Sequence, residues 1–548
     1  MKVLFEDQDS VVVPEETPLM NYVAEYQKHH EHPIVLALVN NRLVDLWYKP
    51  VRDCRINFID LGTIDGIRSY RQSLVFLLLR AFKETYPKAT ISVAHSLGRA
   101  FFFRAEGVEI TEEILKNVSK RMHEIVGMDE PFVRTRMLRE DAIREMQSIG
   151  QDDKVRLLKW IRQKTIHVYS FGTLKDHFFM PLVPSSGYLK HFSLELFKTG
   201  FLLRFPRHST PGTVAKVPKY NKLFDIFQEY ERWGKILEIN DVGHLNEAIA
   251  SGQIDDIIKI SEALHEKKIA YIADNISSKR PNIKLILIAG PSSSGKTTFS
   301  KRLSIQLRVN MLNPFTIEMD DYFVPRTSTP RLPNGDFDYE NIKAIDIDLF
   351  NYHLSELLDG RAIELPKYDF STGQRLNSGK LIQLRQDDVL IVEGIHGLND
   401  ALTPNIPKDL KFKVYVSALT HLNIDNHNRF STTDTRLIRR IVRDSHFRSY
   451  TALDTLRRWP LVREGEDRWI FPFQEEANVM FNSALVYEQS VLKGFAIPVL
   501  QKIPRTELEY SEARRLVDLL SCFMEVSTAE VPNTSILREF VGGSSFRY

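Results

Sequence analysis

The chain has 548 residues, of which 26% are charged and 43% hydrophobic, with a formal net charge of +2. A chain of this length exceeds what one hydrophobic core supports, so several domains are expected. The near-neutral charge gives no global attraction to polyanions, although local basic patches stay open. The two cysteines, Cys54 and Cys522, cannot build a disulfide framework or a thiolate metal site, which favours a reducing compartment.

No apolar run approaches the ~20 residues that cross a bilayer. The first residues, MKVLFEDQDS, are acidic, whereas a secretory signal begins with a basic region before an apolar one. The sequence therefore predicts a cytoplasmic protein without a membrane partner.

The N-terminal third mixes two kinds of pattern. Residues 1–65 alternate short strand-like runs with turn signals, which is typical of a small β-rich domain. Residues 66–205 predict an α+β domain. Its helices are expected at 70–86, 111–126, 136–150 and 152–164, and its strands at 100–104, 167–171, 178–182 and 201–205.

Three segments of this region match a known pattern: ALVNNRLVDL (37–46), LRAFKETYPKA (79–89) and HVYSFGTLKDHFFMPLVPSSGYLKHF (167–192). They resemble the front end of a bacterial threonyl-tRNA synthetase, which is a TGS domain followed by an editing-type domain. The resemblance covers about 200 residues and implies the same two folds here.

The reactive positions of that editing domain differ in this chain. The family uses a His-x-x-x-His pair and a Cys-x-x-x-His pair, but the matching positions hold Gln72 with Phe76 and Phe178 with Leu182. These side chains cannot do the same chemistry, because a phenyl ring neither binds a metal nor moves a proton. We expect a structural or regulatory module that does not hydrolyse mischarged tRNA. RNA binding stays open but is not favoured.

A turn-rich stretch at 206–212 marks the next boundary, and helices are expected at 244–250 and 254–276. A short apolar run, Leu285–Ala289, then predicts a strand buried on both faces of a parallel sheet. GPSSSGKT (290–297) follows and fits G-x-x-x-x-G-K-[ST] at every constrained position. Phe299, Leu303 and Leu307 recur as on the buried face of a helix.

The order strand, loop, helix predicts a phosphate-binding loop. Glycines let the backbone wrap around a phosphate, while consecutive N–H groups and the helix N-terminus supply positive potential. Lys296 is expected to reach the β- and γ-phosphates of ATP or GTP, and Thr297 to bind the Mg²⁺ that bridges them. The expected nucleotide-binding residues are Gly290, Ser292, Ser293, Ser294, Gly295, Lys296, Thr297 and Thr298.

Two downstream strand-like runs end in acidic residues. Phe315–Glu318 leads to Asp320 and Asp321, and Val389–Val392 leads to Glu393. In a doubly wound sheet, ligands bind outside the carboxyl ends of the strands, where such carboxylates usually serve Mg²⁺. For either run taken alone, the alternative is a strand that ends at an acidic residue by chance.

Together with the loop, five ordered motifs carry a second resemblance: MDDYF (319–323), DFDYENIKAID (336–346), PKYDFSTGQR (366–375), VLIVEGI (389–395) and DTRLIRRIVRD (434–444). They resemble the uridine kinase family over residues 284–505. The resemblance implies an α/β P-loop kinase domain with a doubly wound parallel sheet.

It also implies residue roles. Asp320 is the general base that faces a nucleoside 5′-hydroxyl, Asp338 holds the ribose hydroxyls, Tyr368 and Arg375 line the nucleoside pocket, and Glu393 supports the metal. This agrees with chemistry, because an alcohol needs a carboxylate to orient it and accept its proton during in-line phosphoryl transfer. Asp321 stays open as a substitute for Asp320.

Four arginines fall at i, i+3, i+4 and i+7 on one predicted helix face: Arg436, Arg439, Arg440 and Arg443. They are expected to close over the triphosphate as a lid, with Arg436 and Arg440 assigned as catalytic. Which arginines touch phosphate stays open. A solvated face paired with Asp434 and Asp444 is the alternative.

The chain also departs from the kinase family. Gly373 stands where uridine kinases carry a histidine that reads the base, which leaves the base specificity open. The expected activity is Mg²⁺-dependent transfer of the ATP γ-phosphate to a nucleoside, with uridine and cytidine as default acceptors. A phosphoribulokinase-like enzyme for another hydroxylated metabolite and an RNA-associated nucleotide-binding regulator are the alternatives. Homo-oligomer formation is left open.

The expected domains follow from these motifs: 1–65 TGS-like, 66–205 editing-like, 206–280 linker and helical segment, 281–505 uridine kinase-like, and 506–548 a C-terminal helix and tail. The helix is expected at 506–525. The tail is expected to be a docking segment or a frayed end.

Overall fold

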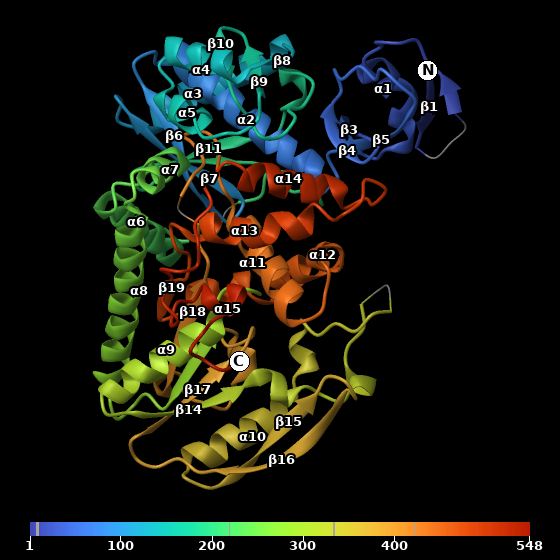
Figure 1. Cartoon of the computed structure of the whole chain (residues 1–548). Helices are drawn as coiled ribbons and strands as arrows, with labels where there is room; N and C mark the ends of the chain where they lie inside the picture. Colours follow the sequence, from blue (N-terminus) through green and yellow to red (C-terminus); the bar gives the residue numbers. More distant parts are fainter. Residues whose placement is uncertain (7–9, 217, 219, 333–334, 421) are drawn as a thin grey trace.

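The computed structural model describes residues 1–6, 10–216, 218, 220–332, 335–420 and 422–548. The N-terminal third lies at the top of Figure 1 and the P-loop sheet in the lower half, with the long helix α8 (Ile254–Ser277) running along one side. Within the described ranges, no helix combines the length and apolar composition that a membrane crossing requires.

The N-terminal domain is a small sheet in the strand order β2-β1-β5-β3-β4. The strands are β1 (Lys2–Phe5), β2 (Ser10–Val12), β3 (Ile34–Val39), β4 (Arg42–Asp45) and β5 (Cys54–Asp60). Asn40 and Asn41, with φ of 49° and 58°, form the tight turn between β3 and β4, which asparagine tolerates better than most residues. A short helix, α1 (Val23–Tyr26), packs on the sheet. The β-rich TGS-like domain is confirmed.

The second domain is α+β, as expected. Its sheets have the antiparallel orders β11-β12-β7-β6 and β10-β9-β8. The strands are β6 (Thr90–Leu97), β7 (Ala100–Glu106), β8 (Val133–Leu138), β9 (Thr165–Phe171), β10 (Leu174–Asp176), β11 (Ser193–Phe197) and β12 (Gly200–Arg204). The helices are α2 (Ile64–Thr85), α3 (Glu112–Met128), α4 (Arg139–Ser148) and α5 (Asp152–Leu158).

Two local predictions in this domain are wrong. The first residues of the helix expected at 136–150 belong to β8, because they pair with β9 across the sheet. The strand expected at 178–182 is not formed. There the amide of Leu182 donates to the Tyr169 hydroxyl, and the amide of Val183 donates to Ser73 Oγ, so side chains replace a neighbouring strand.

Three helices connect this domain to the P-loop sheet: α6 (Asn221–Ile236), α7 (Val242–Ala250) and α8. The predicted helices at 244–250 and 254–276 are confirmed, whereas α6 was not predicted. Its Phe227 ring stacks on His95 of β6, with centroids 4.2 Å apart. The aromatic residues of α6 thus pack between the β11-β12-β7-β6 sheet of the second domain and the P-loop sheet.

The P-loop sheet has the order β14-β17-β13-β18-β19, with every neighbouring pair parallel. Its strands are β13 (Leu285–Ala289), β14 (Asn313–Glu318), β17 (Asp388–Glu393), β18 (Lys411–Ser417) and β19 (Val479–Asn482). Each residue of β13 is fully buried, which explains its unbroken apolar run. Because β14 and β17 lie on one side of β13 and β18 and β19 on the other, the loop after β13 lies at the switch point of a doubly wound sheet.

Helices surround this sheet and continue to the C-terminus. They are α9 (Lys296–Val309), α10 (Ile347–Leu358), α11 (Thr432–Phe447), α12 (Ala452–Trp469), α13 (Glu488–Leu500), α14 (Tyr510–Leu520) and α15 (Arg538–Val541). A hairpin of β15 (Ile363–Asp369) and β16 (Gln374–Ile382) lies beside α10 at the bottom of Figure 1. Residues 510–520 are helical within the predicted range 506–525.

The N-terminal third packs directly on the P-loop domain. One hydrophobic cluster runs from α4 and α5 through α7 and α8 into the P-loop sheet. At the same junction, Lys154 of α5 forms ion pairs with Asp176, at 2.8 Å, and with Asp425, at 2.9 Å. Asp425 lies in the connection between β18 and α11, so this connection is held by the editing-like domain.

The positions that differ from the editing family lie at this junction. Phe76 and Phe178 pack with ring centroids 5.1 Å apart in a buried cluster. Gln72 Nε2 donates to Asn428 Oδ1 at 3.1 Å, and Asn428 Nδ2 donates to the backbone oxygen of His177 at 2.8 Å. Packing and domain contact thus occupy the places where the family has reactive groups.

We predict that Lys154→Met destabilises the protein by about 3–5 kcal/mol, because it removes the ammonium group that the buried carboxylates of Asp176 and Asp425 share and leaves Asp176 with only His427 as an ion-pair partner among the described residues. Lys159→Met at the exposed end of the same helix is the matched control. Urea-induced unfolding of both variants measures the difference. Equal stability of the two variants would contradict the prediction.

Candidate active site

The loop between β13 and α9 is shaped to receive an anion. Gly295 caps α9 with φ of 81°, a conformation that favours glycine, and Lys296 is the first helical residue. Lys296 Nζ donates to the backbone oxygen of Pro291 at 3.3 Å, within its own loop. Phe299 and its two partners on the predicted helix face are fully buried, which confirms the helix that holds the loop.

Two acidic strand ends meet this loop. Thr297 Oγ1 donates to Glu393 Oε1 at 2.7 Å. Asp320 lies in the short helical turn directly after β14, whose last residue pairs in register with Glu393. The parallel sheet therefore brings Lys296, Thr297, Asp320 and Glu393 to the same edge, as the strand-end pattern predicts.

Asp320 and its neighbour Asp321 have different surroundings. Asp321 accepts from the backbone N–H of Tyr368 at 3.3 Å and pairs with Lys367 at 3.1 Å, so it holds the β15 strand. In the described part of the chain, no hydrogen bond engages the Asp320 carboxylate. Desolvation at the site raises the pKa of Asp320, while Lys296 opposes the rise. Of the two carboxylates, Asp320 is thus the solvent-exposed one that no hydrogen bond engages among the described residues.

Glu393 and Glu340 are two further carboxyl groups near Lys296 whose pKa is raised. Burial raises the pKa of Glu393 to about 7, with Lys296 and the Thr297 hydroxyl opposing the rise. Burial and the neighbouring Glu466 raise the pKa of Glu340 to about 7. A cation bound at this edge would favour the charged form of these carboxylates and so lower both pKa values.

The donors fit Mg²⁺. Within the described ranges there is no group of three or more His, Cys, Asp or Glu side chains with metal-binding geometry. Mg²⁺ does not need one, because it binds through one or two protein oxygens together with phosphates and water. Thr297 and Glu393 offer such oxygens, side by side, next to the loop.

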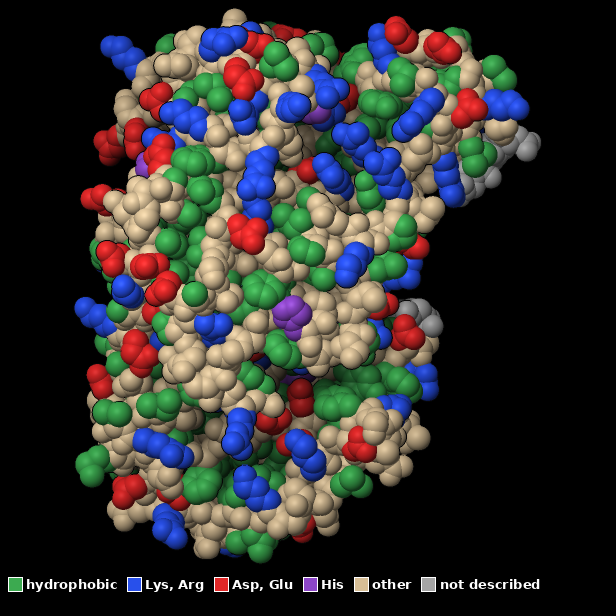
Figure 2. Space-filling view, viewed as in Figure 1, with side chains coloured by type: hydrophobic (Ala, Val, Ile, Leu, Met, Phe, Trp, Pro, Cys, Tyr) green, Lys and Arg blue, Asp and Glu red, His purple; other side chains and the backbone are tan. Residues whose placement is uncertain are grey.

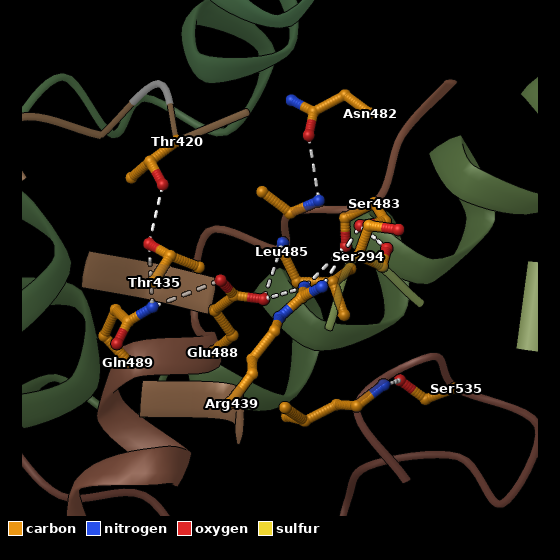
Figure 3. Close-up of polar contacts among 12 residues, drawn as sticks. Ser294, Thr420, Thr435, Arg439, Asn482, Ser483, Leu485, Glu488, Gln489 and Ser535 are labelled. Atoms are coloured by element: carbon orange, nitrogen blue, oxygen red, sulfur yellow. Dashed lines mark hydrogen bonds and ion pairs between the residues drawn. The ribbon is translucent and has the colours of Figure 1, made fainter. Parts of the chain in front are cut away.

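The arginine stripe on α11 differs from the predicted lid. Arg436 is fully buried in a two-point ion pair with Glu466, and Arg439 is fully buried against Glu488 and Ser483. Figure 3 shows Arg439 meeting Ser483, which in turn donates to the backbone oxygen of Ser294 in the loop. These two arginines support the loop from within, because a buried guanidinium requires paired acceptors.

Arg440 is the member of the stripe that touches the loop itself. Its Nη1 donates to Ser292 Oγ at 3.0 Å, and its Nε pairs with Asp444 at 3.2 Å. Arg443 also pairs with Asp444. Of the two arginines assigned as catalytic, only Arg440 is thus placed beside the phosphate-binding loop, and Arg436 acts on it through Glu466.

Two carboxylates on the loop have no counterpart in the predicted site. Glu466 of α12 accepts from the backbone N–H of Ser292 at 3.1 Å. Glu539 of α15 accepts from the backbone N–H of Thr298 at 3.2 Å and from its Oγ1 at 2.7 Å. No sequence motif marks either residue, since both reach the loop from helices that are distant in the chain.

The expected acceptor residues lie along the β15–β16 hairpin and the loop before α10. Asp338 is buried and accepts from Asn341 Nδ2 at 3.3 Å. Tyr368 packs among Phe323 and Phe370, with centroids 5.5 and 5.0 Å away. Arg375 pairs with Asp346 at 2.8 Å. Figure 2 shows the lower half of this face hollowed between α12 and α10, with acidic and basic side chains at the hollow.

The backbone of Gly373 has a left-handed conformation, with φ of 71°, and a Cβ atom at this position would lie 2.6 Å from Arg326 Nε. The place of the family's base-reading histidine is therefore occupied by Arg326. Its Nη2 donates to the backbone oxygen of Phe370, and its Nε donates to the Tyr339 hydroxyl at 3.3 Å. The sequence showed the missing histidine but not this arginine.

We predict that Glu393→Gln stabilises the ligand-free protein at pH 8 by up to about 3 kcal/mol, and much less at pH 5.5. The folded protein holds the Glu393 proton more tightly than the unfolded chain, so wild-type stability falls as the pH rises from about 4.5 through about 7. Thermal unfolding at both pH values measures the effect. Glu476→Gln at an exposed position is the control, and equal shifts in both variants would refute the assignment.

Two comparisons concern the P-loop part of the chain. Residues 285–488 match the model of the Phosphoribulokinase / Uridine kinase family. The solved structure of a possible uridine kinase from Bacillus stearothermophilus is 19% identical and covers 39% of this chain and 98% of that chain, with a TM-score of 0.27.

The N-terminal region is similar to threonine-tRNA ligases. The ligase of Burkholderia vietnamiensis is 31% identical over 186 residues, which are 30% of this chain and 29% of the ligase. That of Methylococcus capsulatus is 32% identical over 158 residues, which are 28% of this chain and 25% of the ligase. The chain thus spans less than a third of the length of these relatives. The chain thus combines a segment, residues 285–488, that matches the Phosphoribulokinase / Uridine kinase family model with an N-terminal region similar to threonine-tRNA ligases.

Proposed function

We propose that the chain is a Mg²⁺-dependent kinase that transfers the γ-phosphate of ATP to the 5′-hydroxyl of a nucleoside. The observation that carries the proposal is the convergence of Lys296, the Thr297–Glu393 pair and the unengaged Asp320 at one edge of a parallel sheet. Mg²⁺ bound with the triphosphate would offset charge on the transferring group.

The protein groups have distinct roles in this proposal. The loop N–H groups and Lys296 hold the phosphates, and Arg440 adds positive charge beside Ser292. Asp320 orients the acceptor hydroxyl and takes its proton as the oxygen bonds to phosphorus. Desolvation raises the pKa of Asp320 and so makes its carboxylate a better proton acceptor than an aspartate of ordinary pKa.

The aromatic rings around Tyr368 support a nucleoside acceptor. Phe323, Tyr339 and Phe370 lie within ring-contact distance of Tyr368 or of one another. Aromatic faces stack on nucleobases without requiring one particular base. This agrees with the loss of the base-reading histidine at Gly373.

A second candidate is a kinase for another phosphorylated or hydroxylated metabolite, of the phosphoribulokinase type. Arg326 favours it, because a guanidinium in the place of the histidine suits a phosphate better than a base. An RNA-associated regulator is the third candidate. Figure 2 shows Lys and Arg side chains gathered where the TGS-like domain meets its neighbour, which is the surface such a role would use.

Transfer of phosphate from labelled ATP to a panel of nucleosides and sugar phosphates tests the proposal. We expect Lys296→Ala and Asp320→Asn to lower kcat by about 100-fold or more. Asp321→Asn is the matched control, because Asp321 binds the hairpin instead; it should change KM more than kcat.

Each outcome selects among the candidates. Transfer to one nucleoside establishes the proposal and names the acceptor, whereas transfer only to a sugar phosphate favours the second candidate. An equal loss of kcat in the Asp320 and Asp321 variants would contradict the assignment of Asp320 as the general base. RNA binding that weakens steeply with salt, without any phosphoryl transfer, would favour the third candidate.

A further inference from the structure

The C-terminal segment returns to the phosphate-binding loop. After α14 the chain passes back toward the N-terminus of α9, where Tyr548 contacts Thr298, and Figure 1 shows the C-terminus in the lower half of the view. We call residues 526–548 the C-terminal segment, and four of its apolar side chains are buried: Val531, Ile536, Leu537 and Phe540. The segment is therefore docked, which is the first of the two states expected from its sequence.

Its Glu539 side chain holds a donor that an anion would use. Thr298 is the third residue of α9, and its N–H is one of those that have no partner within the helix. Glu539 accepts from this N–H at 3.2 Å and from Thr298 Oγ1 at 2.7 Å. Tyr548 adds a contact of 2.7 Å from its hydroxyl to the same Oγ1. A carboxylate thus lies where unpaired N–H groups and the helix dipole attract a phosphate.

We propose that the C-terminal segment is an autoinhibitory element, in which Glu539 occupies part of the nucleotide site and must be displaced when the triphosphate binds. The inference rests on the proposed function of the loop as a nucleotide site. A carboxylate and a phosphate cannot accept from the same N–H at once, and their like charges repel at contact distance.

Glu466 also accepts from a loop N–H, but we do not expect a phosphate to displace it. It is fully buried and neutralised by Arg436, at 2.5 Å, and by Arg463, at 2.8 Å. Glu539 has no ion-pair partner among the described residues, and it adds to the repulsion that raises the pKa of Glu393. Its departure costs no ion pair, so it is the displaceable carboxylate.

The chain around Glu539 can release it without unfolding the segment. The buried side chain of Phe540 can stay in place while the Glu539 side chain rotates away. Gly542 and Gly543, with φ of 87° and 73°, follow α15 and precede the more exposed residues up to Tyr548. Two successive glycines allow that last stretch to change direction.

The segment is also connected to the loop from behind. Phe540 lies under the guanidinium of Arg439, 5.0 Å from the ring centroid. Arg439 donates to Ser483, whose hydroxyl donates to the backbone oxygen of Ser294, as Figure 3 shows. A shift of the docked segment would therefore be transmitted to the loop backbone as well as to Thr298.

The test measures the Kd of Mg²⁺-ATP by calorimetry with the full-length chain. We expect Glu539→Gln, which keeps the shape and removes the charge, to bind about tenfold more tightly than wild type. Glu539→Ala should shift the Kd in the same direction. Glu530→Gln is the matched control, because it removes the same charge from an exposed position in the same segment and should leave the Kd unchanged. Thermal unfolding of each variant verifies its fold.

A Kd of the two Glu539 variants equal to or weaker than that of wild type would overturn the inference, provided that Lys296→Ala weakens binding. Equal tightening by Glu530→Gln would also overturn it, because the effect would then come from net charge. If Lys296→Ala leaves the Kd unchanged, the nucleotide does not bind at this loop, and the proposed function fails together with the inference.

Discussion

The unpaired N–H groups at the start of α9 are the constraint on which the site depends. They follow from the order strand, loop, helix, since a helix cannot satisfy its own first donors. In this structure Glu539 takes the N–H of Thr298 in the first turn of α9, and Glu466 takes the N–H of Ser292 in the loop that precedes the helix. The same donors that make the loop a phosphate site thus also attract acidic side chains of the protein. Competition between Glu539 and a phosphate is a direct consequence.

A second consequence is the balance of charge around Lys296. Asp320 and Glu393 converge on the loop because three parallel strands end at one edge, and desolvation raises the pKa of each. The ligand-free site therefore stores repulsion, which Mg²⁺ and an acceptor proton would each reduce. Buried arginines on α11 do not offset it, because Arg436 and Arg439 are already paired with acids of their own.

The N-terminal third is held to the P-loop domain by side chains of its editing-like fold. Its TGS-like and editing-like folds are present, yet the family's reactive positions hold groups that pack or bind the neighbouring domain. Lys154 joins that domain to the connection before α11, through Asp176 and Asp425. The connection that leads into α11, the helix with the four arginines, is therefore held by the region similar to threonine-tRNA ligases.

The sequence pattern predicted those elements whose structure is determined by residues close together in the chain. The apolar run Leu285–Ala289 and the glycines after it specify a buried strand and a phosphate loop, because burial and backbone freedom act within a few residues. Periodicity likewise predicted α7 and α8. It failed at residues 178–182, where side-chain acceptors from other elements replace a strand partner. The roles of Arg436, Arg326 and Glu539 could not be read from the chain, because each depends on a partner that only packing brings within hydrogen-bond distance.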